Sequence, residues 1–150
     1  MIFVLDTNIL VHTLRNSPIF QQLDKQFDPY GSQNIAIISA VTIGELYSFA
    51  KRNRWGITKM YKVQEILTKV RAIAVEGEWL MESYADIDAY SQSNHPTMTL
   101  SGSARKMSKN DLWIAATACV FESTLLTTDG DFDHLHNTFF RVKYIDSASY

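Results

Sequence analysis

The amino-acid sequence predicts an α/β protein, folded as a three-layer α/β/α sandwich around a mainly parallel sheet of roughly five strands. Short apolar runs alternate along the chain with segments in which apolar residues recur every three or four positions, as on one face of a helix. The short runs are apolar throughout, which is typical of parallel strands covered by helices on both faces. Both observations favour one sheet between two helical layers.

The N-terminal segment begins this alternation. Residues 2–5 form a short run with high β propensity, so a buried strand is expected there. Asp6, Thr7 and Asn8 follow at once, and such residues favour turns and helix N-caps. Residues 9–14 then resume an apolar pattern at helical spacing, which predicts the first helix.

A second strand and its helix are predicted from residue 35 onward. The apolar run 35–38 ends at Ser39, a favourable N-cap residue, and residues 41–51 are helical in pattern. The apolar residues able to share a face of this helix are Val41, Leu46, Phe49 and Ala50. Gly56 ends or interrupts the helix.

The middle of the chain is mostly helical in pattern. Residues 57–72 predict a helix whose apolar positions, three or four apart, are Met60, Val63, Ile66, Leu67 and Val70. A short third strand is expected over residues 72–75 and another helix over residues 78–90. Residues 95–109 are weakly patterned and predict a long loop, and loops of that length in compact domains are usually functional or mobile.

The C-terminal part returns to the alternation. Asn110 and Asp111 begin an apolar, alanine-rich helix that is expected to continue to Glu122. Two short apolar runs, 124–128 and 140–145, predict the fourth and fifth strands. Internal repeats, low-complexity tracts and linkers are not visible, so the whole chain (residues 1–150) is expected to form a single domain.

Composition limits the class of protein. A chain of 150 residues with 46% hydrophobic content has enough apolar surface for a substantial core. The net charge of -2 argues against a generally basic nucleic-acid coat, although a local basic patch remains compatible with it. Cys119 is the single cysteine, and the sequence has neither a signal-peptide pattern nor a membrane-length apolar run. These features predict a cytoplasmic protein with no membrane association.

Four acidic residues fall where parallel α/β proteins bind ligands. Asp6 and Asp129 end predicted strands, Asp111 opens a helix, and Glu45 lies about one turn into the helix after the second strand. The carboxyl ends of parallel strands gather at one edge of the sheet, where ligands bind at switch points in the strand order. We therefore expect these four side chains to converge at that edge.

Convergence of these carboxylates requires a cation. Two carboxylates about 4 Å apart repel by roughly 4 kcal/mol at an effective dielectric constant near 20, so a cluster takes up protons or binds a hard metal ion. Oxygen ligands suit Mg²⁺ or Mn²⁺, whereas zinc prefers nearby His or Cys. A metal-activated water attacking a phosphodiester is the chemistry that fits such a site best.

Four segments of the chain resemble the sequence motifs of PIN-domain nucleases, in the order found in that family. They are Val4-Leu5-Asp6-Thr7-Asn8-Ile9-Leu10, Ser39-Ala40-Val41-Thr42-Ile43-Gly44-Glu45-Leu46, Asn110-Asp111-Leu112-Trp113-Ile114-Ala115-Ala116 and Leu126-Thr127-Thr128-Asp129-Gly130-Asp131-Phe132. The sequence is most similar to VapC-like toxins of toxin–antitoxin pairs, although the stretch between Tyr90 and Asp111 is longer than in many of them.

The resemblance implies a flavodoxin-like α/β/α fold and an endoribonuclease that depends on Mg²⁺ or Mn²⁺. The catalytic and metal-binding acids it implies are Asp6, Glu45, Asp111 and Asp129, with Asp131 as a further metal ligand. Thr7, Asn8 and Thr127 match polar positions that support the family's site. The family also implies an RNA substrate, a homodimer and inhibition by a small antitoxin protein.

Simpler structural explanations exist for most of these acids when each is taken alone. Asp6 is a possible N-cap, Asp111 is favourable near a helix N-terminus, and Asp129-Gly130 is a common turn pair. Glu45 is harder to explain, because it lies between apolar neighbours on a helix expected to be substantially buried. The joint occurrence of all four motifs favours a metal site over separate structural roles.

Two groups of basic residues are candidates for RNA contact, and solvated surface charge explains either group equally well. Arg105, Lys106 and Lys109 precede Asp111, and we predict that they guide the substrate. The second group surrounds two aromatic residues and comprises Lys51, Arg52, Arg54, Lys59 and Lys62, around Trp55 and Tyr61.

Alternative functions fit these residues less well than the nuclease does. A phosphatase with an aspartyl nucleophile needs a second acid where this chain has Asn8, and a catalytically silent binding module would retain the fold without the chemistry. An EF-hand loop starting at Asp129 fails because His134 occupies the position of its glycine and Phe140 that of its glutamate. His134 and His136 are expected at the surface rather than as zinc ligands.

Overall fold

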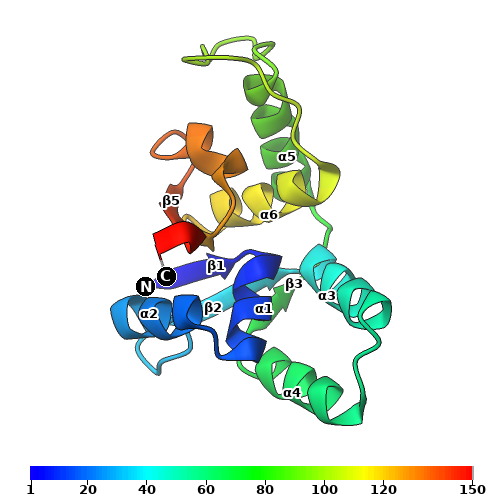
Figure 1. Ribbon diagram of the computed structural model, residues 1–150. Helices are drawn as coiled ribbons and strands as arrows, with labels where there is room; N and C mark the ends of the chain where they lie inside the picture. The colour runs from blue at the N-terminus through cyan, green and yellow to red at the C-terminus, as the bar shows by residue number, and fades with distance from the viewer. Residues whose placement is uncertain (150) are drawn as a thin grey trace.

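A single five-stranded sheet forms the centre of the computed structural model, which describes residues 1–149 (Figure 1). Its strands are β1 (Ile2–Leu5), β2 (Ile35–Ser39), β3 (Arg71–Ile73), β4 (Thr124–Thr127) and β5 (Arg141–Tyr144). The spatial order is β3-β2-β1-β4-β5, and every neighbouring pair is parallel. Flavodoxin shares a three-layer architecture but orders its strands 2-1-3-4-5, so the likeness is one of architecture.

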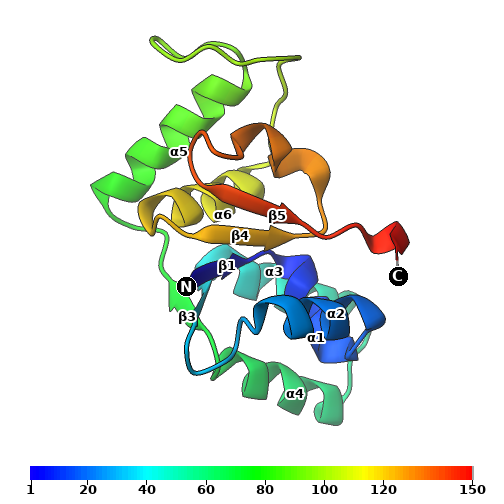
Figure 2. The same ribbon diagram turned by 90° about the vertical axis from the view of Figure 1, so that its left-hand side faces the viewer.

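Helices cover both faces of this sheet, which confirms the predicted α/β/α sandwich (Figures 1 and 2). The α-helices are α1 (Thr7–Arg15), α2 (Pro18–Phe27), α3 (Ala40–Arg52), α4 (Ile57–Leu67), α5 (Glu78–Ser91) and α6 (Lys109–Val120). Two short 3-10 helices, η1 (Gly130–Leu135) and η2 (Ser147–Ser149), flank β5. Helices α1, α2 and α4 lie on one face, and α5 and α6 lie on the other.

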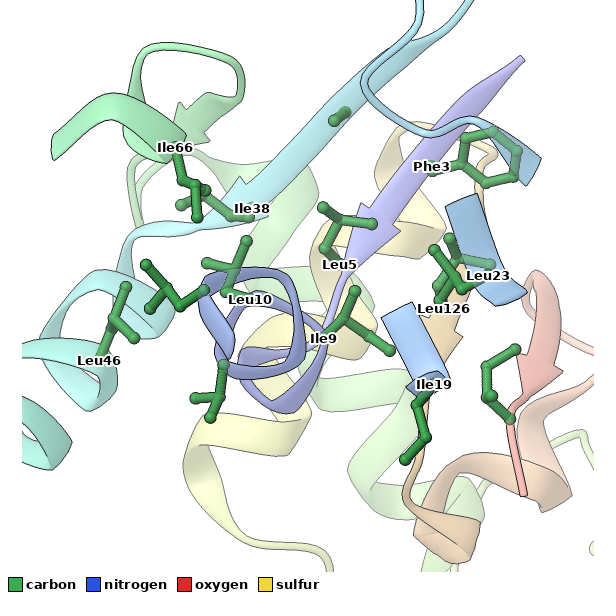
Figure 3. Close-up of a cluster of buried hydrophobic side chains, with 14 of the residues drawn as sticks. Phe3, Leu5, Ile9, Leu10, Ile19, Leu23, Ile38, Leu46, Ile66 and Leu126 are labelled. Atoms are coloured by element: carbon green, nitrogen blue, oxygen red, sulfur yellow. The ribbon is translucent and has the colours of Figure 1, made fainter. Parts of the chain in front are cut away.

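The strands divide their side chains between two apolar cores because successive residues point to opposite faces. In β1, Phe3 and Leu5 join the core under α1, α2 and α4, whereas Val4 joins the core under α5 and α6. Figure 3 shows the first core, in which Phe3 and Leu5 face Ile9 of α1 and Leu23 of α2. The continuous apolar runs of the sequence therefore supply two cores at once.

The sequence patterns predict no helix between residues 15 and 34, yet α2 forms there. Ser17 caps its N-terminus, since the Ser17 hydroxyl accepts a hydrogen bond from the backbone N–H of Phe20 at 3.1 Å. Pro18 follows at the first helical position, where its missing N–H costs nothing. The apolar positions Ile19 and Leu23 are buried in the first core, and this packing stabilises a helix whose other residues are largely polar.

The boundary between the fourth helix and the third strand also differs from the prediction. A helix was expected to residue 72, but α4 ends at Leu67 and Thr68 caps it by donating its hydroxyl to the carbonyl of Glu65 at 2.6 Å. The chain then pairs Arg71–Ile73 with β2, where a strand over residues 72–75 was expected. Pairing with the edge of the sheet thus overrides the helical spacing of the apolar residues.

Residues 92–108 join α5 to α6 without regular secondary structure, as predicted, and extend beyond the end of α5 in Figures 1 and 2. The base of this loop is fixed at Ser91, whose carbonyl accepts from the backbone N–H of Arg105 at 2.8 Å. The Ser91 hydroxyl contacts the sulfur of buried Met107 at 3.4 Å. Among the helices of residues 1–149, none has the length and apolar character needed to cross a membrane.

Candidate metal centre

Asp6 and Asp129 lie at the point where the strand order changes direction. Asp6 directly follows β1 and Asp129 lies two residues after β4, and these two strands are adjacent at the centre of the sheet. Asp6 is the N-cap of α1, and its Oδ1 accepts from the backbone N–H of Thr7 at 2.7 Å. Crevices outside the carboxyl ends of strands at such a switch point are where open α/β sheets bind ligands.

The hydroxyl of Thr127, the last residue of β4, connects these two acids. It donates to Oδ2 of Asp6 at 2.7 Å and accepts from the backbone N–H of Asp129 at 2.9 Å. Thr127 is fully buried, and the hydrogen bond joins segments 121 residues apart in sequence. One side chain therefore fixes the Asp6 carboxylate relative to the start of the next loop.

Glu45 reaches the same region from α3. Its Oε1 accepts from the hydroxyl of Thr7 at 2.9 Å, so Thr7 connects the first turn of α1 to α3. The hydroxyl of Thr42, one turn earlier on α3 and completely buried, lies 3.4 Å from the same Thr7 oxygen. The position of Glu45 is thus fixed by the Thr7 hydroxyl, which also contacts Thr42 of α3.

Asp111 enters from the other helical layer. It lies in the first turn of α6, where its backbone N–H donates to the hydroxyl of the N-cap Ser108 at 3.2 Å. Carboxylate oxygens of Asp111, Asp129 and Asp131 all lie within 4.8 Å of one another. The backbone N–H of Asp131 donates to Oδ1 of Asp129 at 2.9 Å, which orients the start of η1.

These side chains surround a small polar pocket with a volume of about 200 Å³. Its lining residues come from both helical layers and the sheet edge: Asp6, Thr7, Asn8, Val11, Glu45, Phe49, Arg52, Asp111 and Asp129. Asp131 is exposed and lies beside Asp111 and Asp129, outside that lining. The structure therefore brings four acids from four separate segments to one opening, with a fifth at its margin.

The site holds its acids at an electrostatic cost. Burial raises the pKa of Asp6 to about 6, opposed by the hydrogen bonds from Thr127 and Thr7 and reinforced by the negative charges of Glu45 and Asp129. Burial also raises the pKa of Asp111 to about 6, and the charge of Asp6 adds to this effect. Carboxyl groups that resist ionisation beside other carboxylates gain from a neighbouring cation.

The donor set fits a hard divalent cation. Within residues 1–149, the candidate ligands at the pocket and its margin are carboxylate oxygens, without His or Cys among them. Such oxygen ligands suit Mg²⁺, Mn²⁺ or Ca²⁺. A divalent ion would offset both the burial and the added repulsion that raise the pKa of Asp6 and Asp111. The three oxygens within 4.8 Å of one another are close enough to ligate one ion together.

The sequence of residues 3–137 matches the family described as PIN domain, and this match spans most of the chain. The chain belongs to the PIN domain family. All four acids at the pocket lie inside the matched region. No curated protein matches the sequence significantly.

Solved structures share the architecture of this PIN domain at low sequence identity. VapBC2 from Rickettsia felis, bound to a promoter DNA fragment, matches with a TM-score of 0.76 and 19% identity over 97% of this chain and 100% of that chain. VapBC-1 from nontypeable Haemophilus influenzae matches with a TM-score of 0.69 and 21% identity, over 96% of this chain and 98% of that chain. A toxin-antitoxin complex from Klebsiella pneumoniae matches with a TM-score of 0.60 and 21% identity, over 86% of this chain and 88% of that chain.

Several residues considered in the sequence lie elsewhere in the PIN domain. Arg105, Lys106 and Lys109 are exposed and are not part of the pocket lining, so substrate guidance by them stays a prediction. His134 was expected at the surface, but it is half-buried and its Nε2 lies 2.7 Å from the Ser91 hydroxyl. His136 is exposed, in agreement with the expectation.

Sequence reasoning missed other residues of the pocket. Phe49 and Arg52 line it from α3, and Val11 lines it from α1. Glu45, Phe49 and Arg52 are four and three positions apart, the spacing that places residues on one helical face. The spacing alone does not separate this face from the core, because Phe49 also packs against the first apolar core and Arg52 belongs to a run of basic residues.

Proposed function

We propose that this PIN domain is an endoribonuclease that depends on a divalent metal ion, Mg²⁺ or Mn²⁺. The observation that carries the proposal is the convergence of Asp6, Glu45, Asp111 and Asp129 on one pocket in a chain of this family. Asp6 and Asp129 also cap helix N-termini, but capping does not require four mutually repelling carboxylates around one pocket. Their arrangement is therefore explained by the ion and the reaction they serve.

In this proposal the protein's own residues bind the metal ion and hold its ligands in position. Asp6, Asp111 and Asp129 hold the cation with Glu45, and Asp131 contributes from the margin. A bound divalent ion supplies the Lewis acidity that phosphodiester hydrolysis requires. The hydroxyls of Thr7 and Thr127 keep Glu45 and Asp6 in position, and Asn8 offers a polar contact at the opening.

RNA is the proposed substrate, in single-stranded form. The four motifs resemble those of PIN-domain ribonucleases, and the pocket lies at the protein surface, with exposed Asn8 at its opening. A single strand can present its backbone to a shallow acidic site that a rigid duplex would reach less easily.

We further propose that the protein is the toxin of a toxin–antitoxin pair. The VapBC structures and the toxin-antitoxin complex described above share its fold, and the motifs resemble those of VapC-like toxins. On this proposal a small antitoxin protein covers the acidic groove, the toxin forms a homodimer and the pair acts in the cytoplasm. Co-expression with the product of a small neighbouring gene, followed by co-purification, tests the pairing.

A cleavage assay tests the enzymatic proposal. End-labelled single-stranded RNA is incubated with the protein in Mg²⁺, in Mn²⁺ and in EDTA, beside Asp6→Asn. The matched control is Asp133→Asn, because Asp133 is exposed on η1 and loses the same charge outside the pocket. We expect cleavage only with metal, reduced roughly 100-fold or more by Asp6→Asn and unchanged in the control.

Other outcomes separate the remaining functions. Hydrolysis restricted to small phosphomonoesters would replace the nuclease with a phosphatase. RNA binding without cleavage in either metal would indicate a catalytically silent binding module. Cleavage that persists in EDTA or in Asp6→Asn would contradict the metal mechanism.

A further inference from the structure

Two arginines lie at the far end of the face that begins at the acidic pocket. On α3, Glu45, Phe49 and Arg52 all line the pocket and follow one another at helical spacing. On α1, Asn8 and Val11 line it too, and Arg15 continues that spacing at the helix C-terminus. Both helices start near the acids, so the two stripes run in the same direction.

The two arginines converge on one aromatic ring. The guanidinium carbon of Arg15 lies 5.6 Å from the centroid of Phe49, and that of Arg52 lies 5.8 Å from the same centroid. Two cations from different helices therefore contact the same ring despite their like charge, since an aromatic ring attracts cations. Phe49 thus places a pair of guanidinium groups at the end of the pocket.

Both guanidinium groups are available to a ligand. Arg15 and Arg52 are exposed, and the one ion pair within 4.0 Å found in residues 1–149 joins His95 to Asp86. The helix dipoles favour a basic residue in the last turn of α1 and of α3, which explains why each position carries an arginine. The dipoles do not explain why both side chains turn to the same ring beside four carboxylates.

From this geometry we infer that Arg15 and Arg52 form a phosphate-binding site for single-stranded RNA, next to the proposed cleavage site. The inference rests on the proposed function and identifies residues that bind its substrate. Guanidinium groups bind phosphate oxygens in a planar, two-pronged geometry that suits a polyanionic backbone. The acidic pocket alone repels such a backbone, so attraction must come from cations at its border.

The length of the stripes agrees with a strand that crosses both sites. Arg52 lies seven residues beyond Glu45, which corresponds to roughly 10 Å along a helix. A phosphodiester chain with one phosphate at the acids therefore presents a neighbouring phosphate near the arginines. An RNA strand supplies these repeated charges along its whole length, and we therefore favour it over an acidic protein segment as the ligand.

Binding without cleavage tests this inference independently of catalysis. The probe is a fluorescein-labelled single-stranded RNA 12-mer, and its anisotropy is measured against protein concentration between roughly 50 and 200 mM salt. Titrations use EDTA and, separately, Mg²⁺ in an Asp6→Asn background. The variants are Arg15→Gln, Arg52→Gln and their double, with Arg141→Gln as the matched control, because Arg141 is exposed at the start of β5, outside the lining of the acidic pocket.

We expect the double variant to bind RNA about tenfold more weakly, and the slope of log affinity against log salt to fall by about 1.4, the value for two lost phosphate contacts. Arg141→Gln should bind within about twofold of the parent protein, because it removes a single charge distant from the pocket. Where cleavage is detected, KM should rise in the double variant while kcat changes little, because these residues bind substrate and do not touch the reacting atoms.

Unchanged affinity and salt slope in the double variant would overturn the inference, and would favour an acidic protein segment as the ligand of this pair. Equal losses in Arg141→Gln and the double variant would overturn it too, because they would indicate unspecific attraction. Absence of RNA binding by the parent protein under both conditions would have the same consequence. Failure of cleavage alone, with binding dependent on Arg15 and Arg52, would contradict the proposed enzyme and leave this site standing.

Discussion

The two edges of the sheet carry hollows that differ in size and in charge. The carboxyl edge has the acidic pocket of about 200 Å³, whereas the amino edge has a hollow of about 600 Å³. Residues of the larger hollow carry charges of both signs, including Glu122 and Arg141. The smaller pocket gathers four carboxylates against a single arginine, Arg52, and the pKa values of Asp6 and Asp111 are raised there. Concentrated like charge, rather than volume, distinguishes the candidate functional edge.

Substitution of two threonines at the opposite ends of β4 allows the two edges to be compared directly. Thr127 ends β4 at the acidic pocket, and Thr124 begins the same strand at the amino edge, and both are buried. Thr127→Val removes the hydroxyl that donates to Asp6 and accepts from Asp129, so we expect metal affinity and RNA cleavage to fall between about 10-fold and 100-fold. Thr124→Val should leave both within about twofold. Equal effects at the two positions would remove the distinction between the edges.

Stability in the absence of metal should depend on pH because of Asp6. Its pKa is about 6 in the folded protein and 3.8 in the unfolded chain, so the folded state binds the proton more tightly and loses stability as pH rises between these values. For Asp6 alone this amounts to about 1 kcal/mol between pH 5 and pH 7, or roughly 2–4 °C in Tm.

Thermal unfolding in EDTA measures this effect as a difference between two proteins. Other acids change the pH profile as well, so the wild type is compared with Asp6→Asn at each pH. We expect the variant to gain stability relative to the wild type as pH rises from 5 to 7, and Glu122→Gln at the amino edge to follow the wild type. Parallel profiles for wild type and Asp6→Asn would show that Asp6 carries no such cost.

The smallest effect is expected from the loop before α6. Arg105, Lys106 and Lys109 are exposed outside the pocket lining, so their charges act on RNA through solvent and are screened by salt. Replacing all three with Gln should weaken RNA binding a few-fold at low salt and flatten its salt dependence. Unchanged binding and salt dependence would limit RNA attraction to other surfaces, such as the Arg15 and Arg52 pair.

Sequence patterns predicted most of the fold because buried parallel strands and amphipathic helices leave periodic signals. The exceptions have physical causes. Helix α2 depends on a capping signal at Ser17 and Pro18 and on two apolar contacts, which is too little for periodicity to reveal. The end of α4 is decided by pairing of Arg71–Ile73 with β2, a long-range interaction that local spacing does not contain.

The acidic residues of the candidate site were accessible to sequence reasoning for a different reason. Their positions follow from the rule that parallel strands end at one edge, so Asp6 and Asp129 required only the strand assignments. The roles of Thr42 and Arg15 were not predicted, because their contacts depend on how α1 packs beside α3. Tertiary packing, rather than local pattern, determines which neighbours of an acid contact it.

Calorimetric titration with Mn²⁺ at pH 7 tests the central claim, that acids from separate segments form one cation site. We predict saturable binding by the wild type, weakened by at least about tenfold in both Glu45→Gln and Asp111→Asn, and unchanged in Glu122→Gln. Because Asp6 and Asp111 have a pKa of about 6, binding at pH 6 should also release protons, detected as a dependence of the heat on the buffer. Wild-type protein that shows no saturable binding, or variants that bind as tightly as wild type, would contradict the account.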